Sequence, residues 1–136
     1  MRIMLDTNIL FSAIVLRSKI LTPMVAWIAD RHTLVLSTYV MDECRDVVRR
    51  KKPSLLPALE AFFQAMPMEV YTTPDIIPTH DLFSIRDRKD EKVMYSAIDS
   101  GVDVLITGDK DFSPVKIPKP EILTVREFID RYGPVS

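Results

Sequence analysis

The sequence is poor in cysteine and glycine and carries almost no net charge. Its single cysteine, Cys44, has no partner for an internal disulfide, and the chain begins without the features of a secretory signal, so a cytoplasmic protein is expected. Only 3 glycines occur among 136 residues, and no repeat or low-complexity segment is present, which argues against a disordered chain or a solenoid. A formal net charge of -1 means that any nucleic acid must bind to local basic patches.

Apolar runs are present, but they are short. The most apolar one, PMVAWIA at 23–29, is far shorter than the roughly 20 residues that cross a bilayer, so no membrane role is expected. The hydrophobic content of 47% is sufficient for one buried core in a chain of this length. Residues 1–136 are therefore expected to form a single domain.

Short segments rich in branched apolar residues alternate with helical patterns along the chain. Nearly all-apolar strands separated by helices are typical of a parallel sheet that is covered on both faces. The pattern predicts a three-layer α/β/α sandwich around a mainly parallel sheet of about five strands. The strands are expected at 2–5, 34–36, 68–71, 102–107 and 122–124.

Three helix starts carry capping signals. Ser37 is expected to cap the helix through residues 40–50, and Thr22 the helix through 24–30. Thr124 and Glu127 have the T-x-x-E spacing of a reciprocal capping box.

Two acids follow the ends of apolar strands. Asp6 comes directly after the first expected strand, and Asp109 comes shortly after the fourth. Either residue alone is most simply a turn residue or a helix cap. Sites in parallel sheets nevertheless form beyond the carboxyl ends of the strands, where the strand order reverses, so both acids are candidates for one crevice.

Helical periodicity selects two more acids. At about 100° per residue, Glu43 lies on the rim of the apolar stripe that contains Val40 and Cys44, whereas Asp42 and Asp46 lie on the solvent side. In the later helix, Asp90 heads the apolar positions 93, 94 and 97. Simple capping of that helix is an equally good explanation of Asp90.

Together these acids indicate a metal site. At about 4 Å separation and an effective dielectric near 20, two ionised carboxylates repel by about 4 kcal/mol, and a divalent cation reverses that energy. Oxygen ligands without a histidine or cysteine cluster favour Mg²⁺ or Mn²⁺. His32 and His80 receive no role, and Cys44 is expected to be a packed thiol. The set is Asp6, Glu43, Asp90 and Asp109, with Asp111 as a fifth member.

Two basic runs, at 45–52 and 86–92, are the local patches that could contact phosphates. Such runs are more often solvated helix ends, so taken alone they indicate little. As phosphate contacts they would orient a nucleic acid strand without reading its bases. The candidate RNA-binding residues are Arg45, Arg49, Arg50, Arg86 and Lys89.

Four segments in order resemble the PIN-domain ribonucleases, and among them the bacterial VapC-like toxins. They are MLDTNILFSA, LVLSTYVMDECRDVV, the stretch at 85–112 and ILTVREFI, which together cover nearly the whole chain. The resemblance implies that the catalytic acids are Asp6, Glu43, Asp90 and Asp109. It also implies metal binding by Asp6, Asp90 and Asp109, with Glu43 and Asp111 as further ligands, and support from Asn8 and Thr107. Asp87 matches a position that is often acidic in the family, but we expect it to be structural.

The resemblance implies an Mg²⁺- or Mn²⁺-dependent endoribonuclease that cleaves single-stranded RNA, the toxin of a pair with an antitoxin protein. Homodimers are common among such relatives. The loop VLRSKILTP and the basic run RRKKPSLLP depart from the usual pattern. The alternatives are a stand-alone RNA-processing nuclease and a PIN-like binding module without turnover. An aspartyl-phosphate hydrolase or phosphoacceptor is more remote, because Asn8 replaces the second acid of a DxD motif.

Overall fold

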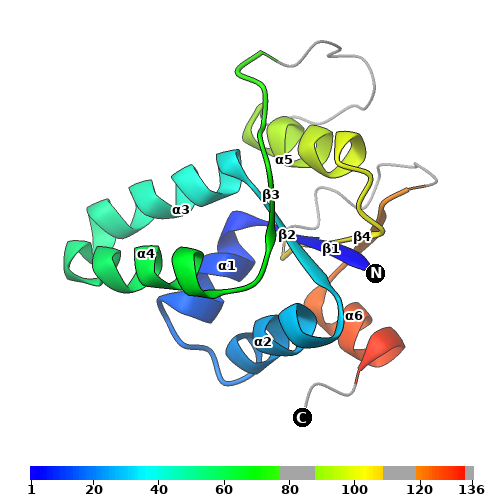
Figure 1. Cartoon of the computed structure of the whole chain (residues 1–136), viewed down its shortest axis with the longest axis horizontal. Helices are drawn as coiled ribbons and strands as arrows, with labels where there is room; N and C mark the ends of the chain where they lie inside the picture. Colours follow the sequence, from blue (N-terminus) through cyan, green and yellow to red (C-terminus); the bar gives the residue numbers. More distant parts are fainter. Residues whose placement is uncertain (77–87, 109–118, 134–136) are drawn as a thin grey trace.

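The computed structural model describes residues 1–76, 88–108 and 119–133, without the side chains of residues 88–90. One or more helices separate successive strands along the chain, except for the last two strands, between which no helix lies in the described residues (Figure 1). The elements are β1 (Arg2–Leu5), α1 (Thr7–Ile14), α2 (Leu21–Arg31), β2 (Thr33–Ser37), α3 (Thr38–Lys51), the short 3₁₀ helix η1 (Pro53–Leu55), α4 (Leu56–Ala65), β3 (Glu69–Tyr71), α5 (Arg88–Asp99), β4 (Val104–Ile106), β5 (Glu121–Leu123) and α6 (Val125–Tyr132).

The five strands form one parallel sheet in the order β3-β2-β1-β4-β5. Helices lie on both sides of the strands, as Figure 1 shows, so the predicted three-layer sandwich is confirmed. The chain builds the sheet from β1 towards one edge and then returns to the other side of β1 with β4. The strand order therefore reverses between β1 and β4, which is where sites form in such sheets.

The two strands beside this reversal are buried on both faces. Every side chain of 3–5 in β1 and of 104–106 in β4 is at most 1% exposed. Burial of whole strands explains why the sequence shows continuous apolar runs instead of alternation. β4 is shorter than the predicted strand at 102–107, although Asp103 and Thr107, just beyond its ends, still form backbone hydrogen bonds to the neighbouring strands.

Two of the three predicted caps are confirmed. The Ser37 hydroxyl accepts the N–H of Val40 at 3.1 Å. Thr124 and Glu127 form the reciprocal capping box at the start of α6. In each case the local spacing sufficed, because the contacts span only three residues.

The predicted cap at Thr22 is wrong. Helix α2 begins at Leu21, and the Thr22 hydroxyl donates to the carbonyl of Ala13 instead. The Ser18 hydroxyl accepts the N–H groups of Ile20 and Leu21. The proline at position 23 permits this earlier start, because a proline in the first turn removes no hydrogen bond that the helix needs.

Cys44 is fully buried in the core, as expected for a packed thiol. Burial is the main cause that raises the pKa of this thiol to about 12, and the neighbouring Glu43 raises it further. The thiol is therefore protonated at neutral pH and is no nucleophile. Among the described helices, none is both long and apolar enough to span a bilayer.

Candidate functional site

Asp6 occupies the point where the strand order reverses. It lies between β1 and α1, and its Oδ1 accepts the N–H of Ile9 at 2.9 Å, which caps α1. Its Oδ2 accepts the hydroxyl of Thr107 at 2.5 Å and the N–H of Gly108 at 3.2 Å, both beyond the end of β4. Asp6 is only 6% exposed. Donors from two adjacent strand ends thus fix one carboxylate in the crevice.

The capping explanation of Asp6 is correct but incomplete. A helix cap needs only one carboxylate oxygen, and Oδ1 performs that task. The second oxygen is held by residues about a hundred positions later in the chain. These donors and the N-terminal end of α1 stabilise a negative charge that is almost buried.

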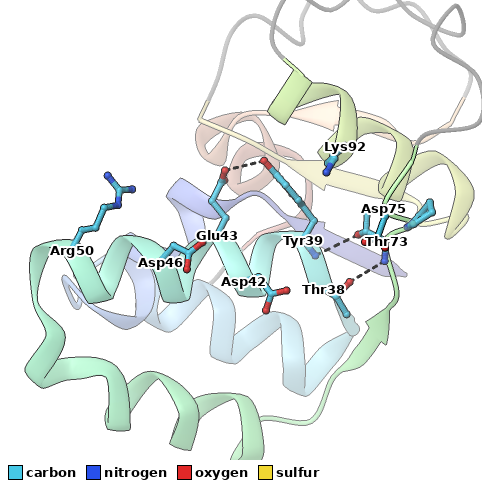
Figure 2. A pocket seen from close by; sticks show the side chains of 10 residues that line it. Thr38, Tyr39, Asp42, Glu43, Asp46, Arg50, Thr73, Asp75 and Lys92 are labelled. Atoms are coloured by element: carbon cyan, nitrogen blue, oxygen red, sulfur yellow. Dashed lines mark hydrogen bonds between the residues drawn. The ribbon is translucent and has the colours of Figure 1, made fainter.

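Glu43 approaches from α3 and is held at both carboxylate oxygens. Oε1 accepts the hydroxyl of Thr7 at 2.5 Å. Oε2 accepts the hydroxyl of Tyr39 at 3.0 Å, the bond that Figure 2 shows. Tyr39 precedes Glu43 by one helical turn, so both side chains lie on one face of α3. Glu43 is half-buried, whereas Asp42 and Asp46 are exposed, in agreement with the predicted helix faces.

Thr7 connects the two acids. It follows Asp6 in the chain, is buried, and reaches across to Glu43 on α3. No role was expected for Thr7 or Tyr39 from the sequence. The i, i+4 spacing of Tyr39 and Glu43 was a usable signal, but no local pattern pairs Thr7 with a residue 36 positions later.

A hollow of about 470 Å³ lies beside Glu43. Figure 2 shows it along the face of α3, with the segment after β3 and helix α5 completing the wall. The Thr73 hydroxyl holds that segment in place by bonding to Ser96 of α5 at 2.9 Å, and the Thr73 N–H donates to Thr38 at 2.9 Å. The lining is mostly polar: Thr38, Tyr39, Asp42, Glu43, Asp46, Arg50, Thr73, Pro74, Asp75 and Lys92.

Comparison with known proteins identifies the family. The model of the PIN domain matches residues 2–111, which is most of the chain. The chain belongs to the PIN-domain family. This match confirms the resemblance that the four sequence segments indicate. PIN domains are nuclease domains.

A solved structure shares the fold of this PIN domain. It is VapBC2 from Rickettsia felis bound to a DNA fragment from their promoter, with 20% sequence identity and a TM-score of 0.65. The match covers 90% of this chain and 97% of the other. At this identity the likeness establishes the architecture alone. No curated protein matches the chain.

Of the other residues predicted to bind or support the metal, one contacts Asp6, one is exposed, and the rest are described only in part or not at all. Thr107 contacts Asp6, whereas Asn8 is exposed and its side chain makes no hydrogen bond within the described part of the chain. Asp90 is the third residue of α5, inside the first turn and not at the N-cap position, and its side chain is not described. The residues that lie outside the description are Asp109, Asp111, Arg86, Asp87 and His80.

The described part of the site offers oxygen ligands for a metal ion. Asp6 and Glu43 present carboxylates, and no cysteine or histidine side chain forms a hydrogen bond with them within residues 1–76, 91–108 and 119–133. These side chains alone contain no group of three acids, histidines or cysteines that could enclose an ion. A hard cation fits this oxygen chemistry, and its further ligands would be the predicted Asp90 and Asp109.

Two of the predicted RNA-binding residues are engaged in ion pairs. Arg45 forms a two-point pair with Glu60 of α4, at 2.8 and 2.9 Å, and also contacts Asp42 at 2.9 Å. Hydrogen bonding to Arg45 lowers the pKa of the Glu60 carboxyl. Arg49 pairs with Asp46 at 3.0 Å. The described contacts therefore give Arg45 a structural use, the attachment of α4 to α3.

Arg50 differs from these two arginines. It lines the hollow and is exposed, and no carboxylate pairs with it in the part of the chain that the structure describes. The side chain of Lys89 lies outside the description. Lys92, which belongs to the predicted basic run at 86–92 but was not among the candidate RNA-binding residues, also lines the hollow.

Proposed function

We propose that this PIN domain is a metal-dependent endoribonuclease that hydrolyses single-stranded RNA and is the toxin of a toxin-antitoxin pair. The observation that carries the proposal is the Asp6 carboxylate, fixed by Ile9, Thr107 and Gly108 beside Glu43 at the sheet reversal. A helix cap needs only one carboxylate oxygen, whereas both oxygens of this almost buried acid are held, by donors beyond two strand ends. Membership of a nuclease family supports the same reaction class.

Asp6, Asp90 and Asp109 would hold Mg²⁺ or Mn²⁺, with Glu43 and Asp111 as further candidates. When bound, the ion supplies an activated water and neutralises charge on the phosphate during in-line displacement. Asp6 cannot turn away from this position, because its three hydrogen bonds fix both oxygens. The protein thus provides the ion with a ligand that needs no reordering.

Glu43 is placed to position the attacking water. Thr7 and Tyr39 fix its carboxylate, and each oxygen keeps capacity to accept a further hydrogen bond. Hydrolysis adds the hydroxide of that water to phosphorus, breaks the bond to the leaving oxygen and transfers a proton to it. Glu43 would accept the water proton during attack, as a general base does.

Substitution of Asp6 by asparagine tests the assignment. Asparagine is nearly isosteric and also caps helices, so Asp6→Asn is expected to fold. Metal-dependent cleavage of a labelled single-stranded RNA should fall by at least about a hundredfold, the scale of losing one strong electrostatic contact in a transition state. Asp46→Asn, which changes an exposed acid that lines the hollow beside Glu43, is the matched control. Undiminished cleavage by Asp6→Asn would overturn the assignment.

The antitoxin partner is supported by an apolar groove on another face. The groove has a volume of about 740 Å³ and is formed by α2 and α4 above α1. Its walls carry small exposed side chains, among them Ala26, Ala58 and Ala61, beside the half-buried ring of Phe62. Small residues permit close approach of another backbone, so an amphipathic helix of the antitoxin would fit. The structural neighbour is itself a VapBC2 assembly.

The stand-alone nuclease and the silent binding module remain the competing functions. A stand-alone nuclease would cleave RNA and show no partner in its gene neighbourhood. A silent module would bind RNA without cleaving it across several divalent metals. RNA cleavage and RNA binding are measured on the purified protein, and the presence of a partner is read from the gene neighbourhood.

A further inference from the structure

Lys92 lines the same hollow as the proposed catalytic acid, Glu43. Its Nζ is 5.3 Å from the centre of the Tyr39 ring, and the hydroxyl of that tyrosine bonds to Glu43 (Figure 2). The lysine is half-buried and lines the hollow. No ion pair engages it in the part of the chain that the structure describes.

The positive charge of the hollow is therefore concentrated at two residues. The exposed acids Asp42 and Asp46 are each paired with an arginine of α3. Lys92 and Arg50 are left as lining cations that form no ion pair with a described residue. Asp75 adds a further negative charge to the lining, so an anion could settle only near one of these two cations.

The two cations lie on either side of Glu43. Lys92 contacts Tyr39, one turn before Glu43 on α3, whereas Arg50 lies about two turns after it. Figure 2 shows Glu43 between them along the helix. Two positive side chains that flank a catalytic acid along one axis match the repeating negative charge of a nucleic acid backbone.

We propose that Lys92 and Arg50 bind backbone phosphates on the two sides of the scissile bond, so that the RNA strand runs along α3 across Glu43. The inference deepens the proposed ribonuclease function and rests on it. Tyr39 holds the Lys92 stem and ammonium in place by a cation–π contact, so little freedom is lost when a phosphate binds. Phosphate contacts of this kind orient the strand and do not select its bases.

A salt titration of binding tests the proposal separately from cleavage. The probe is a short fluorescein-labelled single-stranded RNA, bound by a Glu43→Gln protein with Mg²⁺ so that the strand stays intact. Each phosphate contact contributes about 0.7 to the slope of log affinity against log salt for single strands. Lys92→Ala should reduce the slope by about that amount, Arg50→Ala likewise, and the double variant by about twice as much.

Two further variants make the test specific. Arg126→Ala removes one exposed positive charge from α6 and should leave the slope unchanged. Lys92→Arg keeps the charge and should restore the slope. The loss should be equal for RNAs of different sequence, since bases are not read. If the slope of Lys92→Ala equals that of Arg126→Ala, the proposed contact does not exist. If the parent protein binds no RNA, the proposed function itself fails.

Discussion

The hydroxyl of Thr107, just past β4, donates a hydrogen bond to the carboxylate of Asp6, just past β1. The two residues are 101 positions apart in the chain, and the parallel pairing of β1 with β4 brings them together. The contact fixes the acid at the reversal of strand order. The proposed chemistry depends on this acid keeping one orientation.

Thr107→Val tests that dependence. Valine has the shape of threonine but lacks the hydroxyl, so Asp6 loses a charge-assisted hydrogen bond in a buried setting. The expected loss of folding free energy is about 1.5–3 kcal/mol, together with a clear fall in kcat. Urea denaturation and RNA cleavage measure the two effects. Thr107→Ser retains the hydroxyl and should stay close to the parent protein, whereas full activity in Thr107→Val would show that the contact is not needed.

Tyr39→Phe isolates the orientation of Glu43. The phenyl ring still supports Lys92, but the hydrogen bond to Glu43 is removed. We expect kcat to fall by about tenfold or more while KM stays nearly constant, because the lost contact positions a catalytic group and does not hold RNA. Steady-state kinetics on one RNA substrate decide the matter. A rise in KM with unchanged kcat would assign Tyr39 to substrate binding instead.

Glu60→Gln tests the attachment of α4 to α3. Arg45 lowers the folded pKa of Glu60, so the ion pair stabilises the protein at neutral pH. This contribution falls as the pH drops below the unfolded value of about 4.3 and is lost below the folded pKa. The Glu60 side chain is 38% exposed, so solvent screening limits the effect to about 0.5 kcal/mol. Urea unfolding at neutral and acidic pH should show a difference only at neutral pH, and an equal difference at both would contradict this origin.

Ala61→Arg tests the apolar groove as the antitoxin surface. Ala61 is exposed on α4, so a long charged side chain can be accommodated without disturbing the core. If the proposed antitoxin binds there, the variant should keep its RNA cleavage but lose binding to a candidate antitoxin from the same gene neighbourhood, as measured by co-purification after joint expression. Gln64→Arg, also exposed on α4 but not part of the groove lining, is the control. Retained antitoxin binding in Ala61→Arg would place the partner elsewhere.

The sequence was informative wherever a contact is local or follows from strand order. The run at 2–5 matched β1, and Asp6 reached the reversal point because a parallel sheet with helical crossovers leaves few topologies. The faces of α3 followed from angles alone, so Glu43 was separated from Asp42 and Asp46.

The contacts that escaped prediction link distant segments or depend on competition between partners. Thr22 could have capped α2, but its hydroxyl donates a hydrogen bond to the carbonyl of Ala13 instead. The basic residues at 45–52 could not be told apart from the sequence, because the partner of Arg45, Glu60, lies in another helix. The contact of Lys92 with the ring of Tyr39 could not be predicted, since the two residues lie on different helices.

A crystal structure with Mn²⁺, whose anomalous scattering locates the ion, tests most directly whether Asp6 binds a metal. We expect an anomalous peak within bonding distance, about 2.0–2.4 Å, of an Asp6 carboxylate oxygen, with Asp90 and Asp109 as the other ligands of the ion. The peak should be absent from Asp6→Asn crystals grown in the same way. An ordered Mn²⁺ elsewhere would show that Asp6 is not its ligand. Side chains of Asp90 and Asp109 far from Asp6 would show that these carboxylates do not share one cation.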